Sequence, residues 1–249
     1  MTRLTFGIVG SSESGAFYSA ARNRDVGYTI GFPASHTEGD SIPLIVMLHG
    51  EGGNHTNALA SMTPAQAVAL RVDSQALDPM ALVTVDCGDG YWNPHPGDDP
   101  MAMITDELIP MCLRLGLGRH RIGAMGISMG GYGALLLAEK NPRLIDAVAA
   151  ISPAVFTSYS NAVRVNRASY ASAADFSSDD VITNAGSLSG VAVRVASGVS
   201  DPFHPGVASL ANALPKSATV DFAGGCHDDQ FFLEQEPPSL KFLSENLAR

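Results

Sequence analysis

Short apolar runs alternate with longer helix-compatible stretches along most of the 249 residues, and this alternation constrains the fold more than any other feature. The runs that resemble strands lie at 44–48, 81–85, 122–125, 147–151, 191–196 and 218–222, and the helices are expected at 64–76, 100–115, 128–140, 205–214 and 239–248. Parallel strands joined by crossover helices produce such a pattern, and near-continuous apolarity indicates strands covered on both faces. The sequence therefore predicts an α/β fold with a mostly parallel central sheet and helices on both faces.

Two segments depart from this rhythm. Residues 4–30 contain polar turns between short strand-like runs and predict antiparallel edge strands. Residues 156–188 are rich in Ser, Ala and Asn, and they predict a lid-like insertion of short helices and loops over the carboxyl edge of the sheet. An ordinary crossover helix with long loops is the alternative. We expect residues 1–249 to form a single domain.

Composition excludes several classes of protein. Hydrophobic residues make up 45% and charged residues 16% of the chain, which predicts a folded core and not a disordered chain. The net charge of -10 repels phosphate backbones, and no basic cluster interrupts it, so we expect no nucleic-acid partner. The three cysteines, Cys87, Cys112 and Cys226, are an odd number without a CxxC pair, which argues against a disulfide scaffold and a zinc site.

The sequence shows no recognisable targeting signal. The apolar run at 4–9 is far shorter than the roughly 18 residues of a membrane span, so we expect no stable membrane insertion. It is also too short for a signal-peptide core, which favours a cytoplasmic protein as the sequence is written. An exported protein whose signal has been removed would look the same.

The sharpest chemical signal is the motif GISMG at 126–130, directly after an expected strand and before an expected helix. A strand-to-helix turn this tight strains the serine backbone, and the flanking glycines remove side chains that would collide there. The turn lifts the hydroxyl of Ser128 above the edge of the sheet. This context predicts a nucleophile elbow with Ser128 as the nucleophile.

A serine hydroxyl needs a histidine base and an acid, which follow the elbow in the chain order acid, then histidine. Only His204 and His227 follow Ser128, and His227 lies in a glycine-containing loop just past the last expected strand, so His227 is the predicted base. Asp201 follows the strand at 191–196 through a short turn and is the predicted acid. The competing interpretation of Asp201 is a turn residue before Pro202.

An oxyanion formed at the ester carbon needs two backbone donors. The residue after the nucleophile, Met129, supplies one, and the loop after the first central strand, HGEGGN at 49–54, supplies the other through the N–H of Glu51. We expect the Glu51 side chain to turn away from the oxyanion. A metal site formed by Glu51 with His49 and His55 fails on spacing, and no metal or other cofactor is predicted.

The motifs LHGEGGN, GISMGGYGAL, SDPF and GGCHDDQFF, in this order, resemble the esterase D branch of the α/β-hydrolases. That branch includes S-formylglutathione hydrolases, feruloyl and enterochelin-type esterases and mycolyltransferases, and the likeness extends over about 15–247. It implies an α/β-hydrolase fold, a triad of Ser128, Asp201 and His227, and oxyanion donors at Glu51 and Met129. Cys226 and the acidic pair after His227 depart from the pattern, and they bear on the acyl pocket.

The loop at 89–97 contains the only tryptophan and follows a strand. Loops at this edge line substrate sites, so Trp92 and Tyr91, together with His49 at the start of the oxyanion loop, are the predicted substrate-binding residues. The alternative role of the two aromatic residues is to anchor a proline-rich loop.

These residues together predict a serine carboxylesterase that forms an acyl-enzyme on Ser128 and acts on a small-molecule, lipid or sugar ester. An acyltransferase of the mycolyltransferase type, which passes the acyl group to a sugar or alcohol, shares the same triad. A binding protein that keeps the hydrolase fold without turnover is the alternative from another class. The oligomeric state, the acyl chain length and the alcohol half of the ester do not follow from the sequence.

Overall fold

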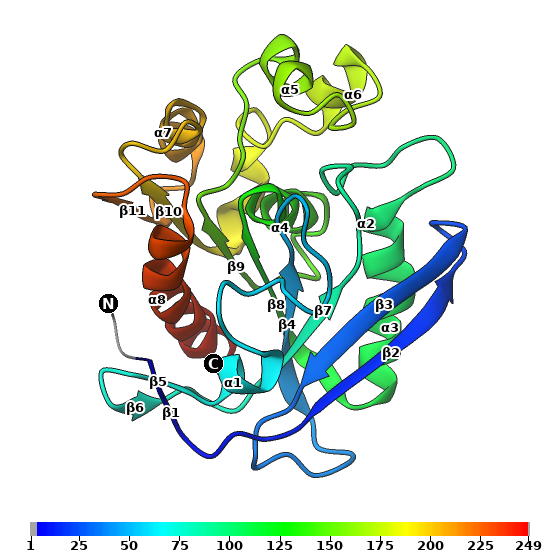
Figure 1. The fold of residues 1–249 in the computed structure, drawn as a ribbon, viewed down its shortest axis with the longest axis vertical. Coiled ribbons are helices and arrows are strands. Elements are labelled where there is room, and N and C mark those ends of the chain that lie inside the picture. The colour runs from blue at the N-terminus through cyan, green and yellow to red at the C-terminus, as the bar shows by residue number, and fades with distance from the viewer. Residues whose placement is uncertain (1–3, 249) are drawn as a thin grey trace.

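The computed structural model describes residues 4–248, and a large twisted sheet forms its centre (Figure 1). Its strands are β2 (Ser12–Ser19), β3 (Arg24–Gly31), β4 (Ile42–Leu48), β7 (Ala81–Val85), β8 (Leu117–Ile127), β9 (Ala147–Ile151), β10 (Ala192–Gly198) and β11 (Thr219–Ala223). Within the described residues these eight strands lie in the order β11-β10-β9-β8-β4-β7-β3-β2. β3 pairs antiparallel with β2 and with β7, whereas the other neighbours are parallel. The predicted fold class is confirmed.

Helices cover both faces of this sheet. They are α1 (Pro64–Val68), α2 (Pro100–Ala102), α3 (Ile109–Arg114), α4 (Met129–Lys140), α7 (His204–Ala213) and α8 (Asp229–Leu247). Side chains alternate along a strand, so β4 sends Val46 into the apolar layer shared with α4 and α7, and Met47 into the layer shared with α1 and α8. The sheet is therefore buried on both sides, as its near-continuous apolar strands require.

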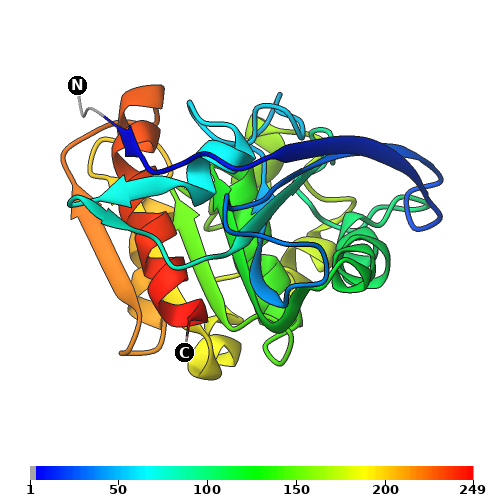
Figure 2. The same ribbon diagram turned by 90° about the horizontal axis from the view of Figure 1, so that it is seen from below.

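The antiparallel hairpin of β2 and β3 occupies the edge of the sheet opposite β11, and Figure 2 shows it far from α8. Edge strands at the start of the chain are thus present as expected. The first strand, β1 (Thr5–Phe6), instead belongs to a separate small sheet with β5 (Leu70–Val72) and β6 (Gln75–Ala76).

That small sheet corrects the helix expected at 64–76. The helix α1 ends at Val68, because the chain then forms β5, which pairs antiparallel with β1. Asp73 and Ser74 both have positive φ, 52° and 65°, and form the tight turn to β6. Two consecutive left-handed residues suit a two-residue hairpin and cannot continue a helix.

The last helix also differs from its expected bounds. α8 begins ten residues before 239, at Asp229, with the Asp228 carboxylate capping its first turn through a hydrogen bond from the Phe231 N–H of 3.0 Å. Pro237 and Pro238, directly before the expected start at 239, lie inside it. Buried side chains on both sides of the prolines hold the helix against the sheet and outweigh the lost backbone hydrogen bonds.

The helix expected at 100–115 forms with an irregular centre. α2 continues into a π-helical turn, η1 (Met103–Leu108), and then into α3. The Ile109 N–H bonds the Ile104 carbonyl, five residues back. Pro110 lies in the next turn, and it has no N–H to donate, so a regular helix would leave a carbonyl without a donor there.

The segment 156–188 lies above the carboxyl edge of the sheet, near the N-terminal end of α4 (Figure 1). It holds the short helices α5 (Tyr159–Val165) and α6 (Ala173–Ser178) and runs into the 3₁₀ turn η2 (Ala185–Gly190). The Tyr132 hydroxyl of α4 donates to the Asp179 carbonyl over 2.9 Å and anchors this segment to the helix that follows the elbow. Its role as a lid stays a prediction.

Within residues 4–248, none of the helices combines the length and the hydrophobicity that crossing a bilayer requires. Over the same residues, no group of three or more acidic, histidine or cysteine side chains is arranged to hold a metal ion.

Candidate active site

Ser128 occupies the turn between β8 and α4, with φ of 57° and ψ of −119°. A residue other than glycine in this region is strained by roughly 1–3 kcal/mol, and the neighbouring backbone must hold it there. The Ser128 N–H donates to the Ile151 carbonyl over 2.9 Å, and the Ser128 carbonyl accepts from the Ala154 N–H over 3.0 Å. The strand next to the turn therefore fixes the serine from both sides.

The glycines around Ser128 are required by close backbone contacts. A Cβ on Gly126 would collide with the carbonyl of Gly130, and a Cβ on Gly130 would collide with the carbonyl of Leu48. Because rigid backbone fills both spaces, no larger residue fits without moving β4 or β8. These contacts are the physical reason for the motif.

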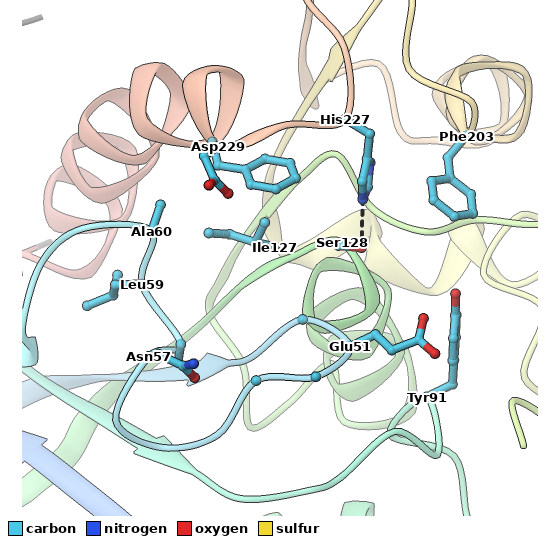
Figure 3. A pocket seen from close by; sticks show the side chains of 15 residues that line it. Glu51, Asn57, Leu59, Ala60, Tyr91, Ile127, Ser128, Phe203, His227 and Asp229 are labelled. Atoms are coloured by element: carbon cyan, nitrogen blue, oxygen red, sulfur yellow. Dashed lines mark hydrogen bonds between the residues drawn. The ribbon is translucent and has the colours of Figure 1, made fainter. Parts of the chain in front are cut away.

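The structure brings Ser128, His227 and Asp201 together from three separate loops. The Ser128 Oγ lies 2.8 Å from His227 Nε2 (Figure 3), and His227 Nδ1 lies 2.8 Å from Asp201 Oδ2. A carboxylate only accepts hydrogen bonds, so Nδ1 carries the proton and Nε2 is left as the acceptor for the serine hydroxyl. This is the tautomer that a general base needs.

Asp201 is held as an ion in a buried position. Its side chain is 0% exposed, and its Oδ1 accepts from the Phe203 N–H over 2.8 Å. Burial by itself would raise the pKa of Asp201, but the hydrogen bonds from His227 and from the Phe203 N–H outweigh it and hold the pKa below its usual value. The carboxylate is thus ready to stabilise a charged imidazole.

Two aromatic rings enclose the histidine. The rings of Phe203 and Phe232 have centroids 5.0 Å and 5.1 Å from that of His227, both edge to face. The loop behind His227 is fixed by Gly225, whose carbonyl accepts from the Ser200 N–H over 3.0 Å. The imidazole is oriented by its neighbours before any substrate binds. His204, the other histidine after the elbow, lies instead near Ser197, with 3.5 Å between Nδ1 and Oγ.

The oxyanion loop lies directly beside the serine. A Cβ on Gly50 would lie only 3.6 Å from the Ser128 Cβ, and the Gly53 N–H closes the turn onto the Gly50 carbonyl over 3.0 Å. The Met129 N–H is in the first turn of α4, where backbone N–H groups lack an acceptor within the helix. The N–H of Glu51 is in the turn, next to Gly50. Both predicted donors are thus in segments next to Ser128, and their role in binding an oxyanion stays a prediction.

A pocket of ≈ 570 Å³ opens over this group. Figure 3 shows Ser128 and His227 at its centre, and the remaining lining comes from several loops. It consists of Gly50, Glu51, Gly52, Gly53, Asn57, Ala58, Leu59, Ala60, Tyr91, Ile127, Phe203, Asp229 and Phe232. Such a volume accommodates a small organic molecule.

The predicted substrate-binding residues separate in the structure. Tyr91 lines the pocket, whereas Trp92 and His49 do not. Trp92 is 0% exposed, donates through Nε1 to the His49 carbonyl over 3.2 Å, and fills the space beside Gly133. Tyr91 is itself only 1% exposed and borders the pocket from the core, and both residues have a φ of 58°.

His49 supports the oxyanion loop from below. Its Nδ1 donates to the Gly50 carbonyl over 2.7 Å, and its Nε2 accepts from the Cys87 N–H over 3.0 Å. Both nitrogens are therefore used, and burial lowers the pKa of His49 and keeps the ring neutral. His49 and Trp92 were predicted to bind substrate, but both are buried behind the loops that line the pocket and neither lines it.

Several residues of the site were missed by the sequence reasoning. Asn166 joins two loops of the site, because its Nδ2 lies 2.8 Å from Glu51 Oε1 and 2.9 Å from the Asp89 carbonyl. The Asp89 carboxylate in turn accepts from the Gly52 N–H over 2.7 Å. Nothing near Asn166 in the sequence signals this role, whereas Phe203 and Phe232 lie in the SDPF and HDDQFF motifs.

The comparisons with known proteins agree with this geometry. A family model described as “Putative esterase” matches residues 19–218, which is most of the chain. The chain belongs to this esterase family. The protein is therefore an ester hydrolase, and its family implies small-molecule ester substrates. No curated protein matches the sequence of this esterase.

Solved structures share the fold of the esterase at low identity. A ferulic acid esterase superposes with a TM-score of 0.76 and 18% identity, over 95% of this chain and 98% of the other. An S-formylglutathione hydrolase from Agrobacterium tumefaciens gives 0.76 and 15%, over 98% of each chain. FphF, a fluorophosphonate-binding serine hydrolase of Staphylococcus aureus, gives 0.72 and 14%, over 95% and 99%. These likenesses establish the α/β-hydrolase fold.

Proposed function

We propose that the protein is a serine carboxylesterase that forms an acyl-enzyme on Ser128. The observation that carries this proposal is the continuous hydrogen-bonded chain from Ser128 through His227 to Asp201, with two distances of 2.8 Å, at the floor of a pocket. A serine hydroxyl is activated when an oriented neutral imidazole can take its proton. The esterase family and its serine hydrolase neighbours support the same chemistry.

In the first half of the reaction His227 Nε2 takes the proton of Ser128 as Oγ attacks the ester carbonyl carbon. The carbonyl π electrons move to oxygen, and the N–H groups of Met129 and Glu51 stabilise the oxyanion. Asp201 stabilises the charged imidazole. The intermediate then collapses, and His227 gives its proton to the departing alcohol, which leaves an acyl group on Ser128.

In the second half water takes the position of the alcohol. His227 accepts a proton from this water, the hydroxyl attacks the acyl carbon, and the same donors hold the second oxyanion. Collapse returns the proton to Ser128 Oγ and releases the carboxylic acid. An alcohol acceptor would follow the same steps, so transfer is a competing fate of the same acyl-enzyme.

The test is intact-protein mass after brief exposure to a fluorophosphonate, with the modified peptide mapped and p-nitrophenyl butyrate hydrolysis measured in parallel. We expect one adduct on Ser128, loss of hydrolysis with labelling, and neither adduct nor hydrolysis in Ser128→Ala. Ser128→Thr is not a suitable control, because a β-branched residue is disfavoured at a positive φ. Ser189→Ala, at an exposed position of η2 away from the pocket, is the matched serine control and should still label.

An adduct on another residue, or unchanged hydrolysis in Ser128→Ala, would overturn the proposal. Adding a primary alcohol during turnover separates the two fates of the acyl-enzyme. Release of free acid at an unchanged rate supports hydrolysis, whereas accumulation of the new ester supports transfer.

A further inference from the structure

The pocket over Ser128 has acidic walls without a compensating cation. Among the described residues that line it, Glu51 and Asp229 carry carboxylates, and no lysine or arginine is present. His227 is the base and is already bonded to Asp201. A bound ester therefore meets negative charge on the pocket walls.

The two carboxylates lie on different sides of the reacting pair. In Figure 3 Asp229 is on the side of Leu59 and Ala60, Glu51 is beside Tyr91, and Ser128 lies between them. An ester bound with its carbonyl at Ser128 extends its acyl half and its alcohol half in different directions. Each half then passes one of the two carboxylates.

The charge of Glu51 is held in place by a neutral partner. Its Oε1 accepts from Asn166 Nδ2 over 2.8 Å, and the same Nδ2 lies 2.9 Å from the Asp89 carbonyl. Partial burial and then the charge of Asp89 raise the pKa of Glu51, against the hydrogen bond from Asn166. The neighbourhood of Glu51 is thus itself negative, and an amide cannot neutralise it.

Asp229 has no cationic side-chain partner either among the described residues. It is the first residue of α8, and its exposed carboxylate takes part in no ion pair within the described residues. Arg164 and Arg167, the cations nearest to Asn166 in the sequence, are both exposed, and neither lines the pocket. The chain as a whole has a net charge of -10, which adds to the field at the pocket mouth.

We propose that this pocket selects its ester by charge: it accepts uncharged and cationic carboxylic esters and rejects esters that carry a carboxylate or phosphate on either half. The proposal rests on the serine esterase function proposed above. Two unit charges about 8 Å apart at an effective dielectric constant of about 40 change a binding constant roughly fivefold. Two carboxylates acting on different halves of the ester therefore give discrimination of about that size for each half.

The test uses butyrate esters of three alcohols that differ in charge: 3,3-dimethylbutanol, choline and 3-hydroxypropanoate. A parallel set of p-nitrophenyl esters places the same charges on the acyl half. The value of kcat/KM is measured for each ester at pH 8 and low salt. It is then divided by the rate constant for hydroxide-catalysed hydrolysis of the same ester. We expect the uncharged ester to exceed the anionic one about fivefold or more, and the cationic ester to match or exceed the uncharged one.

Variants assign the effect to its residues. Glu51→Gln should reduce the uncharged-to-anionic ratio about threefold or more in one ester set, and Asp229→Asn should do so in the other. The ratio is the readout because any common loss of rate cancels in it. Glu245→Gln removes the same charge near the far end of α8 and should leave both ratios unchanged. Raising the ionic strength should shrink the wild-type ratios.

The outcomes separate this proposal from the one on which it rests. If the wild type hydrolyses the uncharged ester and the anionic one within twofold of each other, charge selection is wrong and the esterase function stands. If the wild type discriminates but neither Glu51→Gln nor Asp229→Asn alters a ratio, the assignment to these carboxylates is wrong. If no ester is hydrolysed by any of the proteins, both proposals fall together.

Discussion

The two ends of α4 hold a polar side chain in opposite ways. At its N-terminal end Ser128 has a strained backbone, and its Oγ meets His227 Nε2 at 2.8 Å. At its C-terminal end Glu139 is 7% exposed, and both of its carboxyl oxygens are buried without a hydrogen-bond partner within the described chain. At the N-terminal end a strained backbone is held by hydrogen-bond partners. At the C-terminal end a buried carboxyl group has no such partner within the described chain.

Comparison of Glu139 with Asp201 shows what the partners do. Burial is the largest influence on both carboxyl groups and acts to raise the pKa of each. Hydrogen bonds from His227 and from a backbone N–H reverse the effect at Asp201. At Glu139 the charge of Asp180 adds to the effect of burial, only the charge of Lys140 acts against it, and the pKa rises to about 9. Burial alone therefore does not decide the charge of an acid in this fold. The donors around it do.

The largest effect should follow from removing the charge of Asp201, which bonds His227 next to Ser128. Asp201→Asn should lower kcat for p-nitrophenyl butyrate about 10⁴-fold, because an amide cannot stabilise the imidazolium and favours the wrong tautomer of His227. Steady-state kinetics measure the loss, and thermal unfolding checks that the fold persists. Asp221→Asn, which removes a half-exposed carboxylate paired with Arg194, is the matched control. A loss below tenfold for Asp201→Asn would contradict the assignment of the acid.

Breaking the support of the strained turn should come next. Gly130→Ala places a Cβ against the Leu48 carbonyl, and we expect unfolding free energy to fall by about 3 kcal/mol or more. Gly186→Ala is the matched control, because no atom lies within 4 Å of a Cβ at that position. Urea unfolding measures both variants. Equal stability of the two would show that the elbow tolerates a side chain.

Removing the charge of Glu139, at the C-terminal end of α4, should instead stabilise the protein, and only at high pH. The pKa of folded Glu139, about 9, lies above the ordinary value of 4.5, so the folded state binds more protons between these values and the chain loses stability as pH rises through them. Glu139→Gln cannot ionise and should stabilise the protein by about 1–3 kcal/mol at pH 9, with little change at pH 5. Chemical unfolding at both pH values checks this. A stabilisation independent of pH would contradict the ionisation argument.

The smallest effect should come from the exposed cation beside Glu139. Lys140 Nζ lies 2.7 Å from Asp179 Oδ1, but the lysine side chain is 44% exposed, so Lys140→Met should lower the unfolding free energy by only about 0.5 kcal/mol at pH 7. Lys216→Met, at an exposed position, is the control. Urea titrations compare the two. A loss above about 2 kcal/mol for Lys140→Met would show that this ion pair organises the end of the helix.

Much of the fold follows from local patterns. The parallel strands are short apolar runs, and the structure contains each of them close to its expected bounds, except that β8 begins five residues before the expected 122. The elbow is equally local, because Gly126, Ser128 and Gly130 lie within five residues and satisfy one turn. The sequence also predicted the proximity of Asp201 and His227 to Ser128, since both follow strands whose carboxyl ends meet at one edge.

The failures arise where distant segments compete with local preference. The stretch after Val68 has helical periodicity, but pairing with β1 draws it into a strand. The helix expected at 239–248 begins instead at Asp229, because packing of α8 against the sheet carries it through Pro237 and Pro238, which locally disfavour a helix. Trp92 and His49 have rings with polar atoms and lie on loops near the site. Only their burial in the structure shows that they pack beneath these loops.

The sequence by itself determined the fold class of this esterase and the three residues proposed to react, because a nucleophile elbow and strand-end residues are specified by neighbours a few positions away. The tertiary structure alone decided the walls of the pocket. Glu51, Tyr91, Phe203 and Asp229 lie on four separate segments of the chain, and they meet only because parallel strands end at one edge of the sheet. The charge that a substrate meets depends on which of these side chains face inward and which have partners, and this is a property of contacts between segments far apart in the chain.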